Sequence, residues 1–198
     1  MSARVDGVLV AGGRSRRFGR DKRHEVFGGL TLAEHSLALL RQCTDGVVFI
    51  AGHGAFLHPV QGIAVADAAI GAGPLGAIVA ALSRSEFGVM ALPCDAPLLR
   101  PDSVKAVVQL GRHRSRTVVL RSACGPEPLV AFYPRSALPL LAAALRGGHR
   151  ALHRLLPRLR ALEVKVGAAH ELHNVNRPED LESATAWGTP RSGQGTPT

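Results

Sequence analysis

The sequence predicts one α/β domain, with a mostly parallel sheet covered by helices on both faces. Three observations support this fold class. Short apolar runs alternate with stretches of helical period, as strands and helices alternate in such a sheet. Glycine or aspartate follows several of the runs, where parallel strands would end and ligands bind. A length of 198 residues with 46% hydrophobic composition is sufficient for one compact core.

The first half of the chain has the clearest alternation. The run from Asp6 to Ala11 predicts a buried strand that ends at Gly12-Gly13. Thr31 and Glu34 form a capping-box pattern, and the apolar residues after them share one helical face. The elements expected next are strands at 46–52, 63–67 and 87–95, and helices that begin at Thr31, at Pro74 and near Pro101.

The second half is less regular, and its end is polar. Apolar runs predict strands at 117–120, 127–133 and 162–166, and helical spacing predicts helices at 135–145, at 151–156 and from Pro178 onward. After Trp187 the chain has no apolar residue to anchor it. We therefore expect a folded domain at residues 1–187 and a disordered tail at residues 188–198.

Composition favours a soluble cytoplasmic protein. No apolar stretch approaches the roughly 20 residues of a membrane-spanning helix, and the N-terminus lacks the pattern of a secretory signal. Cys43, Cys94 and Cys124 are odd in number and far apart, and no CxxC pair occurs. This pattern argues against a disulfide framework and against a thiolate zinc site.

The charge of the chain indicates an anionic partner, and much of it gathers in one loop. The formal net charge is +9, and "VAGGRSRRFGRDK" (10–22) follows the first predicted strand. The loop matches neither the Walker A pattern nor the G-x-G-x-x-G fingerprint. Its glycines would let backbone N–H groups approach phosphate oxygens. The nearby cations that could surround a polyphosphate are Arg14, Arg16, Arg17, Arg20, Lys22 and Arg23.

Two other interpretations of this loop are a solvated basic turn and a nucleic-acid-binding segment. A solvated basic turn between a strand and a helix would have the same composition. Nucleic-acid binding is disfavoured, because aromatic residues should then interleave with the basic ones, and Phe18 is the one aromatic residue of the loop.

Several motifs resemble one enzyme family. "AGGRSRRFGRDK" (11–22) is similar to the N-terminal signature L-A-G-G-x-x-x-R-M-G-x-D-K of the molybdenum cofactor guanylyltransferases, which belong to the nucleotidyltransferase superfamily. The resemblance continues in order through "VADAAIGAGPLGAI" (65–78), "LPCDAPLL" (92–99), "EPLVAFY" (127–133) and "NVNRPEDL" (174–181). It covers about residues 5–185 and implies a Rossmann-like, single-domain nucleotidyltransferase fold.

The resemblance also implies an activity. The family transfers GMP from GTP to the terminal phosphate of molybdopterin or Mo-molybdopterin, with release of pyrophosphate, and makes the molybdopterin guanine dinucleotide cofactor. Mg²⁺ would be the cofactor, and molybdoenzyme-specific chaperones are implied as further partners, without nucleic acid or membrane. The alternatives are a cytidylyltransferase or sugar-phosphate nucleotidyltransferase of the same superfamily, and a non-catalytic nucleotide- or cofactor-binding protein.

The same resemblance assigns roles to residues of the loop. Matched by position, the nucleotide-binding residues are Ala11, Gly12, Gly13, Gly19 and Lys22. Arg17 and Lys22 would hold the triphosphate, and Lys22 would stabilise the charge that develops in the transition state. The alternative for Lys22 is an ordinary surface lysine.

Two aspartates and a glycine complete the implied nucleotide site. Asp95 falls on the family's Mg²⁺-binding aspartate and would share the ion with phosphate oxygens. Asp67, with Gly76 allowing close approach, would contact the guanosine. The structural alternatives are a helix or turn cap for Asp95 and a plain turn role for Asp67.

The resemblance also assigns residues to the acceptor side. Asn174 and Asn176 match a motif that holds the acceptor or supports the metal, and could equally be turn and cap residues. Glu127 replaces the glutamine common in the family and would be unfavourable beside a phosphorylated acceptor unless paired. "RHE" (23–25) is also unusual. The run Arg146, Arg150, Arg154 and Arg158 either lines the acceptor pocket or covers a helix face.

Overall fold

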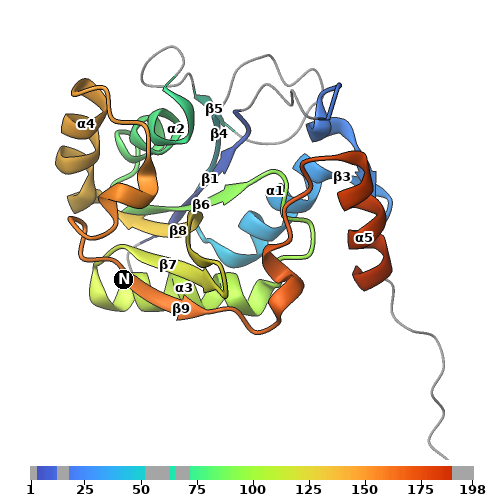
Figure 1. Cartoon of the computed structure of the whole chain (residues 1–198). Helices are drawn as coiled ribbons and strands as arrows, with labels where there is room; N and C mark the ends of the chain where they lie inside the picture. Colours follow the sequence, from blue (N-terminus) through green and yellow to red (C-terminus); the bar gives the residue numbers. More distant parts are fainter. Residues whose placement is uncertain (1–3, 13–17, 52–62, 66–71, 189–198) are drawn as a thin grey trace, which may run out of the picture.

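A mostly parallel sheet forms the centre of the protein. The computed structural model describes residues 4–12, 18–51, 63–65 and 72–188. The strands of the sheet in these ranges are β1 (Asp6–Val10), β4 (Val48–Ala51), β5 (Ile63–Val65), β6 (Gly88–Pro93), β7 (Val118–Ser122), β8 (Gly125–Pro134) and β9 (Leu162–Lys165). They form a seven-stranded sheet in the order β5-β4-β1-β6-β8-β7-β9 (Figure 1).

The sheet confirms the predicted fold class. β1 pairs in parallel with β4 and with β6, β4 with β5, and β7 with β9. β8 is antiparallel to both of its neighbours, β6 and β7. A tight turn ending at Gly125, whose φ is +125°, joins β7 to β8 as a hairpin. β6 and β7 therefore run in the same direction, and β8 lies between them in the opposite direction.

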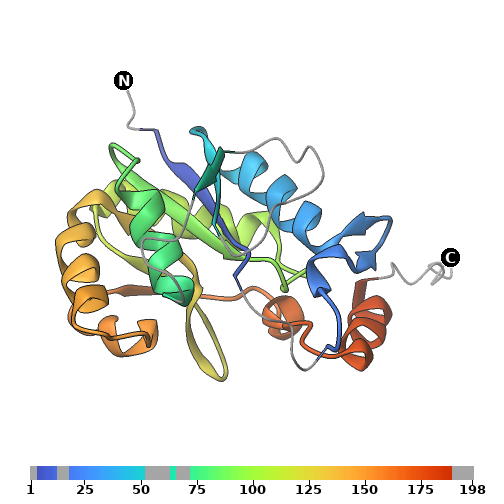
Figure 2. The ribbon, with the colours of Figure 1, turned by 90° about the horizontal axis from the view of Figure 1, so that it is seen from above.

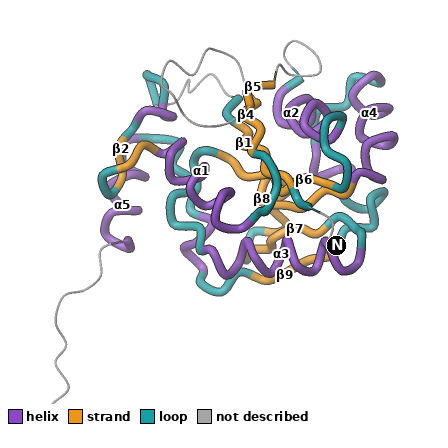
Figure 3. Tube along the Cα trace, turned by 180° about the vertical axis from the view of Figure 1, so that it is seen from behind, coloured by secondary structure: helices purple, strands orange, loops and turns teal. Residues whose placement is uncertain are grey.

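Helices cover both faces of the sheet. They are α1 (Leu32–Cys43), α2 (Gly73–Leu82), α3 (Pro101–Arg114), α4 (Leu138–Arg146) and α5 (Pro178–Gly188), with short 3₁₀ turns η1 (Lys22–His24), η2 (Arg135–Ala137), η3 (Leu152–Leu155) and η4 (Ala169–Leu172). In Figures 2 and 3, α2 and α4 lie together, away from α1 and α3. No helix in the described part of the chain is long and apolar enough to span a membrane.

Two apolar cores result, one on each face. On β1, Val8 belongs to the core beneath α2 and α4, whereas Leu9 belongs to the core beneath α1 and α3. Side chains alternate between the faces of a strand, so a strand buried on both sides must be apolar throughout. The uninterrupted run of β1 is explained by this double burial.

The helix starts expected from the sequence are largely confirmed. Thr31 caps α1, because its Oγ1 accepts from Glu34 N at 3.2 Å while Glu34 Oε2 accepts from Thr31 N at 2.7 Å. Prolines lie in the first turns of α2 and α3. The expected helix at 151–156 is wrong: the chain there forms only η3, a single 3₁₀ turn. The tail from residue 189 onward lies outside the described residues.

A small hairpin before α1 was not expected. β2 (Val26–Phe27) and β3 (Leu30–Thr31) pair in antiparallel fashion around Gly28 and Gly29, whose φ values are +55° and +88°. A two-residue turn with positive φ at both positions matches the twist of a hairpin and favours glycine. The hairpin connects the basic loop to α1.

Candidate active site

Three segments that are distant in the sequence meet at the Lys22 ammonium. Lys22 Nζ donates to Asp95 Oδ2 at 2.6 Å, to Asn176 Oδ1 at 2.9 Å and to Val175 O at 3.1 Å. The Lys22 and Asp95 side chains are only 14% and 19% exposed. The structure therefore brings together Lys22, Asp95 and Asn176, three residues selected from the sequence, with the Val175 carbonyl as a fourth group. We call Lys22, Asp95, Val175 O and Asn176 the lysine cluster.

Strand β6 positions Asp95. Every residue of β6 is buried, and the strand is held between β1 and β8 near the middle of the sheet. Asp95 follows its end by two residues, and its carbonyl accepts from Val175 N at 2.7 Å. The carboxylate therefore lies at the carboxyl edge of the sheet, where ligands of open α/β folds bind.

A small apolar cluster positions the C-terminal segment. The Val175 side chain is fully buried with Phe18, Leu32 and Ala184, which come from the basic loop, α1 and α5. The backbone of Val175 thereby faces both Asp95 and Lys22. Packing of four apolar side chains thus fixes polar backbone groups against the lysine cluster.

Lys22 is positioned by the turn in which it lies. Asp21 is the N-cap of η1, and its carboxylate accepts from Arg23 N at 3.1 Å and from Arg23 Nε at 2.8 Å. The Arg23 guanidinium holds the pKa of Asp21 below its usual value. Arg23 Nη1 also donates to Ala11 O at 3.4 Å. This hydrogen bond joins the C-terminal end of the basic loop to the residue that follows β1.

The described cations of the loop have carboxylate partners within the protein. The Arg20 guanidinium pairs with Glu25, and hydrogen bonding to Arg20 lowers the pKa of that carboxyl. Arg23 pairs with Asp21, and Lys22 with Asp95. Arg20 is 69% exposed, whereas Lys22 is mostly enclosed. The segment "RHE" (23–25) departs from the family pattern. Two of its residues, Arg23 and Glu25, therefore each belong to an internal ion pair.

Several expected site residues lie outside the described residues or away from the cluster. Gly13, Arg17 and Asp67 fall in ranges that the structure does not describe. Ala11 is buried, and its N–H donates to Ala51 O at 2.8 Å, while Gly12 is exposed. Gly19 has a φ of +78°. Gly76 is buried within α2.

The two asparagines differ in their contacts. Asn176 Oδ1 accepts from Lys22, whereas the Asn174 side chain makes no hydrogen bond to any residue in the described ranges. The N–H groups of Asn176 and Arg177 are instead satisfied by Asp180 Oδ2, each at 2.8 Å. The Asn176 side chain therefore binds Lys22 and does not act as the cap that the sequence also allowed.

Glu127 contributes a second carboxylate to the surroundings of Asp95. Glu127 is partly buried on β8, and its burial, together with the nearby Asp95 charge, raises the pKa of its carboxyl. Cys94, next to Asp95, is buried, and this burial raises the pKa of its thiol to about 12. A protonated thiol is a poor nucleophile, so the chemistry of the site rests on charged groups and oxygen ligands.

The donor set fits a hard divalent cation. Asp95 and Asn176 offer a carboxylate and an amide oxygen, and the Lys22 ammonium now lies between them. No group of three His, Cys, Asp or Glu side chains in the described part of the chain could hold a metal by itself. Mg²⁺ commonly binds one or two carboxylates and takes its other ligands from phosphates and water.

A comparison with protein families identifies the family of the chain. The model of the MobA-like NTP transferase domain matches residues 7–164. The chain belongs to this family. The match ends before Val175 and Asn176, so two of the contacts to Lys22 come from the segment that follows it.

Curated relatives of the MobA-like chain carry one name. This chain is 34% identical over 187 residues to a probable molybdenum cofactor guanylyltransferase from Opitutus terrae, with 89% of this chain and 92% of that protein covered. It is 30% identical over 184 residues to the molybdenum cofactor guanylyltransferase of Pseudomonas putida, with 88% and 94% covered. These relatives are nucleotidyltransferases that match nearly the whole chain.

Solved structures support the fold. Molybdopterin-guanine dinucleotide biosynthesis protein A from Archaeoglobus fulgidus has a TM-score of 0.78 and 24% identity, with 92% of this chain and 97% of that chain covered. A manganese complex of a Mycobacterium tuberculosis protein has a TM-score of 0.72 and 19% identity, with 94% and 100% covered.

Some contacts of the site were not found from the sequence. Val175 acts through its backbone, which no residue type marks. The pairing of Arg23 with Asp21 could have been found, because an aspartate before a short helical turn commonly accepts from the N–H two residues later. The position of Glu127 near Asp95 depends on the antiparallel direction of β8 beside β6.

Proposed function

We propose that this MobA-like protein transfers GMP from GTP to the terminal phosphate of molybdopterin or Mo-molybdopterin and releases pyrophosphate. The observation that carries the proposal is the lysine cluster, in which a cation and a carboxylate meet at the carboxyl edge of the sheet. Relatives that match nearly the whole chain bear the name of this activity. A phosphate acceptor and a triphosphate donor would both need such neutralisation of charge.

In this reaction the acceptor phosphate attacks the α-phosphorus of GTP, and the bond to the β-phosphate breaks. Negative charge gathers on the leaving pyrophosphate as the bond lengthens, and the Lys22 ammonium would be the cation that meets it. Asp95 and Asn176 would hold Mg²⁺, which supplies further neutralisation of the phosphate oxygens. The protein itself chiefly positions the two phosphates in line.

Lys22 would change partners during the reaction. In the structure, its ammonium donates to three oxygens of the lysine cluster. An ammonium has three donors, so a phosphate oxygen must replace one of these acceptors. Asp95 would then lose part of its counter-charge and become a better ligand for a cation. Binding of the phosphates and of the metal would therefore support each other.

The remaining residues have proposed roles from the family pattern. Gly12, Gly13 and Gly19 would bring backbone N–H groups to the triphosphate, and Arg17 would add a cation. Asp67 and Gly76 would contact the guanosine. Asn174, beside Asn176, would face the acceptor.

The cellular setting is part of the proposal. We place the reaction in the cytoplasm, with Mg²⁺ as the metal and molybdoenzyme-specific chaperones as recipients of the product. The manganese complex of the Mycobacterium tuberculosis neighbour supports a divalent cation in this fold. Nucleic acid and membranes are not among the proposed partners.

The test is nucleotide choice in a complete reaction. The purified chain is mixed with Mg²⁺, molybdopterin and GTP, CTP or ATP, and pyrophosphate release and dinucleotide formation are measured. GTP should react in preference to the other two. A tenfold or greater preference for CTP, about 1.4 kcal/mol, would replace the guanylyl assignment with a cytidylyl one. Binding of GTP without pyrophosphate release would favour a non-catalytic binding protein.

A further inference from the structure

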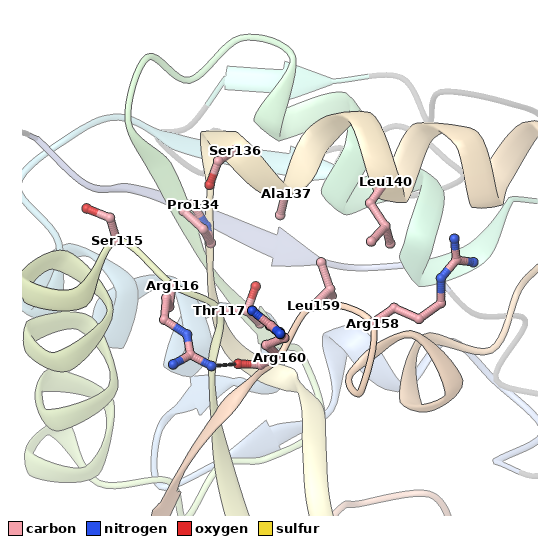
Figure 4. A pocket seen from close by; sticks show the side chains of 10 residues that line it. All are labelled: Ser115, Arg116, Thr117, Pro134, Ser136, Ala137, Leu140, Arg158, Leu159 and Arg160. Atoms are coloured by element: carbon pink, nitrogen blue, oxygen red, sulfur yellow. Dashed lines mark hydrogen bonds between the residues drawn. The ribbon is translucent and has the colours of Figure 1, made fainter.

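A pocket lies at the opposite edge of the sheet from the lysine cluster. It has a volume of about 550 Å³, and its lining includes Thr117, just before β7, and Pro134, at the end of β8 (Figure 4). Pro134 pairs with Gly88, the first residue of β6, whereas Asp95 follows the end of that strand. At about 3.3 Å per residue, the length of β6 separates the two sites by roughly 20 Å.

The lining of this pocket is strongly basic. It contains Arg116, Arg158 and Arg160 and no carboxylate, and it is composed of residues that the structure describes. Arg116 donates to the carbonyl of Arg160. The guanidinium groups of Arg158 and Arg160 have no hydrogen-bond or ion-pair partner within the described ranges. Three like charges around one hollow repel each other, and an anion would relieve that repulsion.

Two residues of the pocket have left-handed backbone conformations. Ser115 and Arg160 have φ values of +49° and +50°, and they are the non-glycine residues with positive φ in the described part of the chain. Both line this pocket. Ser115 is the C-cap of α3, where a left-handed residue is common. Arg160 lies outside any helix, and backbone of this kind clusters at ligand sites, where the surrounding structure maintains it.

Backbone hydrogen bonds keep the arginine segment in place. Leu159 N and Arg160 N donate to Leu155 O and Pro157 O, each at 3.0 Å, and Leu162 N donates to Thr117 O at 2.9 Å. The arginines are therefore presented from a fixed loop rather than from a free surface chain. A ligand would meet guanidinium groups whose backbone needs no reordering.

The other part of the lining is apolar. Leu140, in the first turn of α4, and Leu159 face the hollow, and Figure 4 shows Leu159 between the Arg158 side chain and those of Arg116 and Arg160. Small ligands are commonly held in this way, by an apolar surface and a few polar groups that fix their orientation. The volume also falls in the usual range for such ligands.

We propose that this pocket binds a small organic phosphate. Its phosphate group lies against the guanidinium groups of Arg158 and Arg160, whose planar donor forks match phosphate oxygens. Its apolar part covers Leu140 and Leu159. Inorganic phosphate shares the charged contacts but lacks the apolar ones, so the test compares both sources of phosphate.

The experiment is a titration of the full-length ¹⁵N-labelled chain followed by NMR, with phenyl phosphate, inorganic phosphate and phenol as separate probes. Phenyl phosphate should shift the amide signals of Thr117, Ala137 and Leu159, and should bind more tightly than either other probe. The signals of Lys22, Asp95 and Asn176 report binding at the candidate active site separately. Failure at one site is therefore distinguishable from failure at the other.

Matched variants test the charge. Arg158→Glu should weaken phenyl phosphate binding by about tenfold or more, because it removes a charge-assisted contact. Arg154→Glu makes the same change of net charge at an exposed arginine of η3 that does not line the pocket, and should leave the affinity unchanged. Equal weakening by both variants, or no shift at the pocket amides, would overturn the proposal. Inorganic phosphate binding as tightly as phenyl phosphate would overturn its organic part.

Discussion

The Lys22 ammonium lies 2.6 Å from Asp95 Oδ2, and both side chains are largely enclosed. The cation expected to act on phosphate and the carboxylate expected to hold metal are therefore direct partners of each other. Each charge compensates the other in a site that is largely shielded from solvent. Removal of either one consequently affects both the chemistry and the environment of its partner.

Lys22→Met should reduce turnover far more than it weakens GTP binding. The ammonium is proposed to meet charge that grows only in the transition state, so kcat should fall by about a hundredfold or more, with a much smaller change in KM. Steady-state kinetics of guanylyl transfer measure this split. Lys165→Met, at an exposed lysine of β9, is the matched control and should behave as wild type. A normal kcat with a raised KM would assign Lys22 to ground-state binding.

Asp95→Asn should lower turnover by at least about a hundredfold, or 2.7 kcal/mol of barrier. Asparagine keeps the shape and an oxygen acceptor for Lys22 but removes the negative charge that attracts Mg²⁺. Transfer is measured across Mg²⁺ and Mn²⁺ titrations, and Mn²⁺ should restore part of the activity because it binds such ligands more tightly. The thermal melt should change little, because Lys22 keeps an oxygen acceptor in the asparagine and also retains Val175 O and Asn176 Oδ1. Near-normal transfer at low Mg²⁺ would exclude the metal-ligand role, and a collapsed melt would indicate a structural one.

Asn176→Ala should impair the reaction more than Asn174→Ala. Asn176 Oδ1 is an acceptor for Lys22, and loss of one such charge-assisted hydrogen bond commonly costs about 1.5–3 kcal/mol. We therefore expect roughly a tenfold or greater fall in kcat/KM for the first variant and a smaller fall for the second. Equal effects of the two variants would contradict the difference in their contacts. A larger effect of Asn174→Ala on the KM of molybdopterin alone would instead support its acceptor role.

Glu127→Gln should stabilise the protein increasingly as the pH rises above 4.5. Burial and the Asp95 charge raise the pKa of Glu127 above the ordinary value of 4.5, so the folded state holds this proton more tightly than the unfolded state does. The stability contributed by the protonated group is fully present below the ordinary pKa of 4.5 and is lost as the pH rises through the folded-state pKa. The glutamine variant cannot lose a proton. Its gain in melting temperature over wild type should thus be larger at about pH 7.5 than at about pH 4.5.

The control for this measurement is Glu182→Gln, which removes an exposed carboxylate on α5. Its effect on the melting temperature should be small at both pH values. A Glu127→Gln gain that is the same at both pH values would show that ionisation of Glu127 is not its cause.

Local patterns predicted much of the fold and part of the site. The capping box at Thr31 and the buried strand before Asp95 depend on neighbouring residues, and both are present. The direction of β8 depends on tertiary pairing, which no local pattern specifies. Arg158 illustrates the same limit. Its sequence neighbours left open an acceptor pocket or a helix face, and the structure places it in a pocket at the other sheet edge.

The Val175 backbone, which donates to Asp95 O and accepts from Lys22, also sets when the site can form during protein synthesis. Lys22 and Asn176 are 154 positions apart, a distance that a ribosome covers in roughly ten seconds. A nascent chain that has already made the basic loop and β6 still lacks two of the three oxygens around the ammonium. Chains that stall before Val175 would carry the loop without its completed site, so the activity reports chains translated past Asn176.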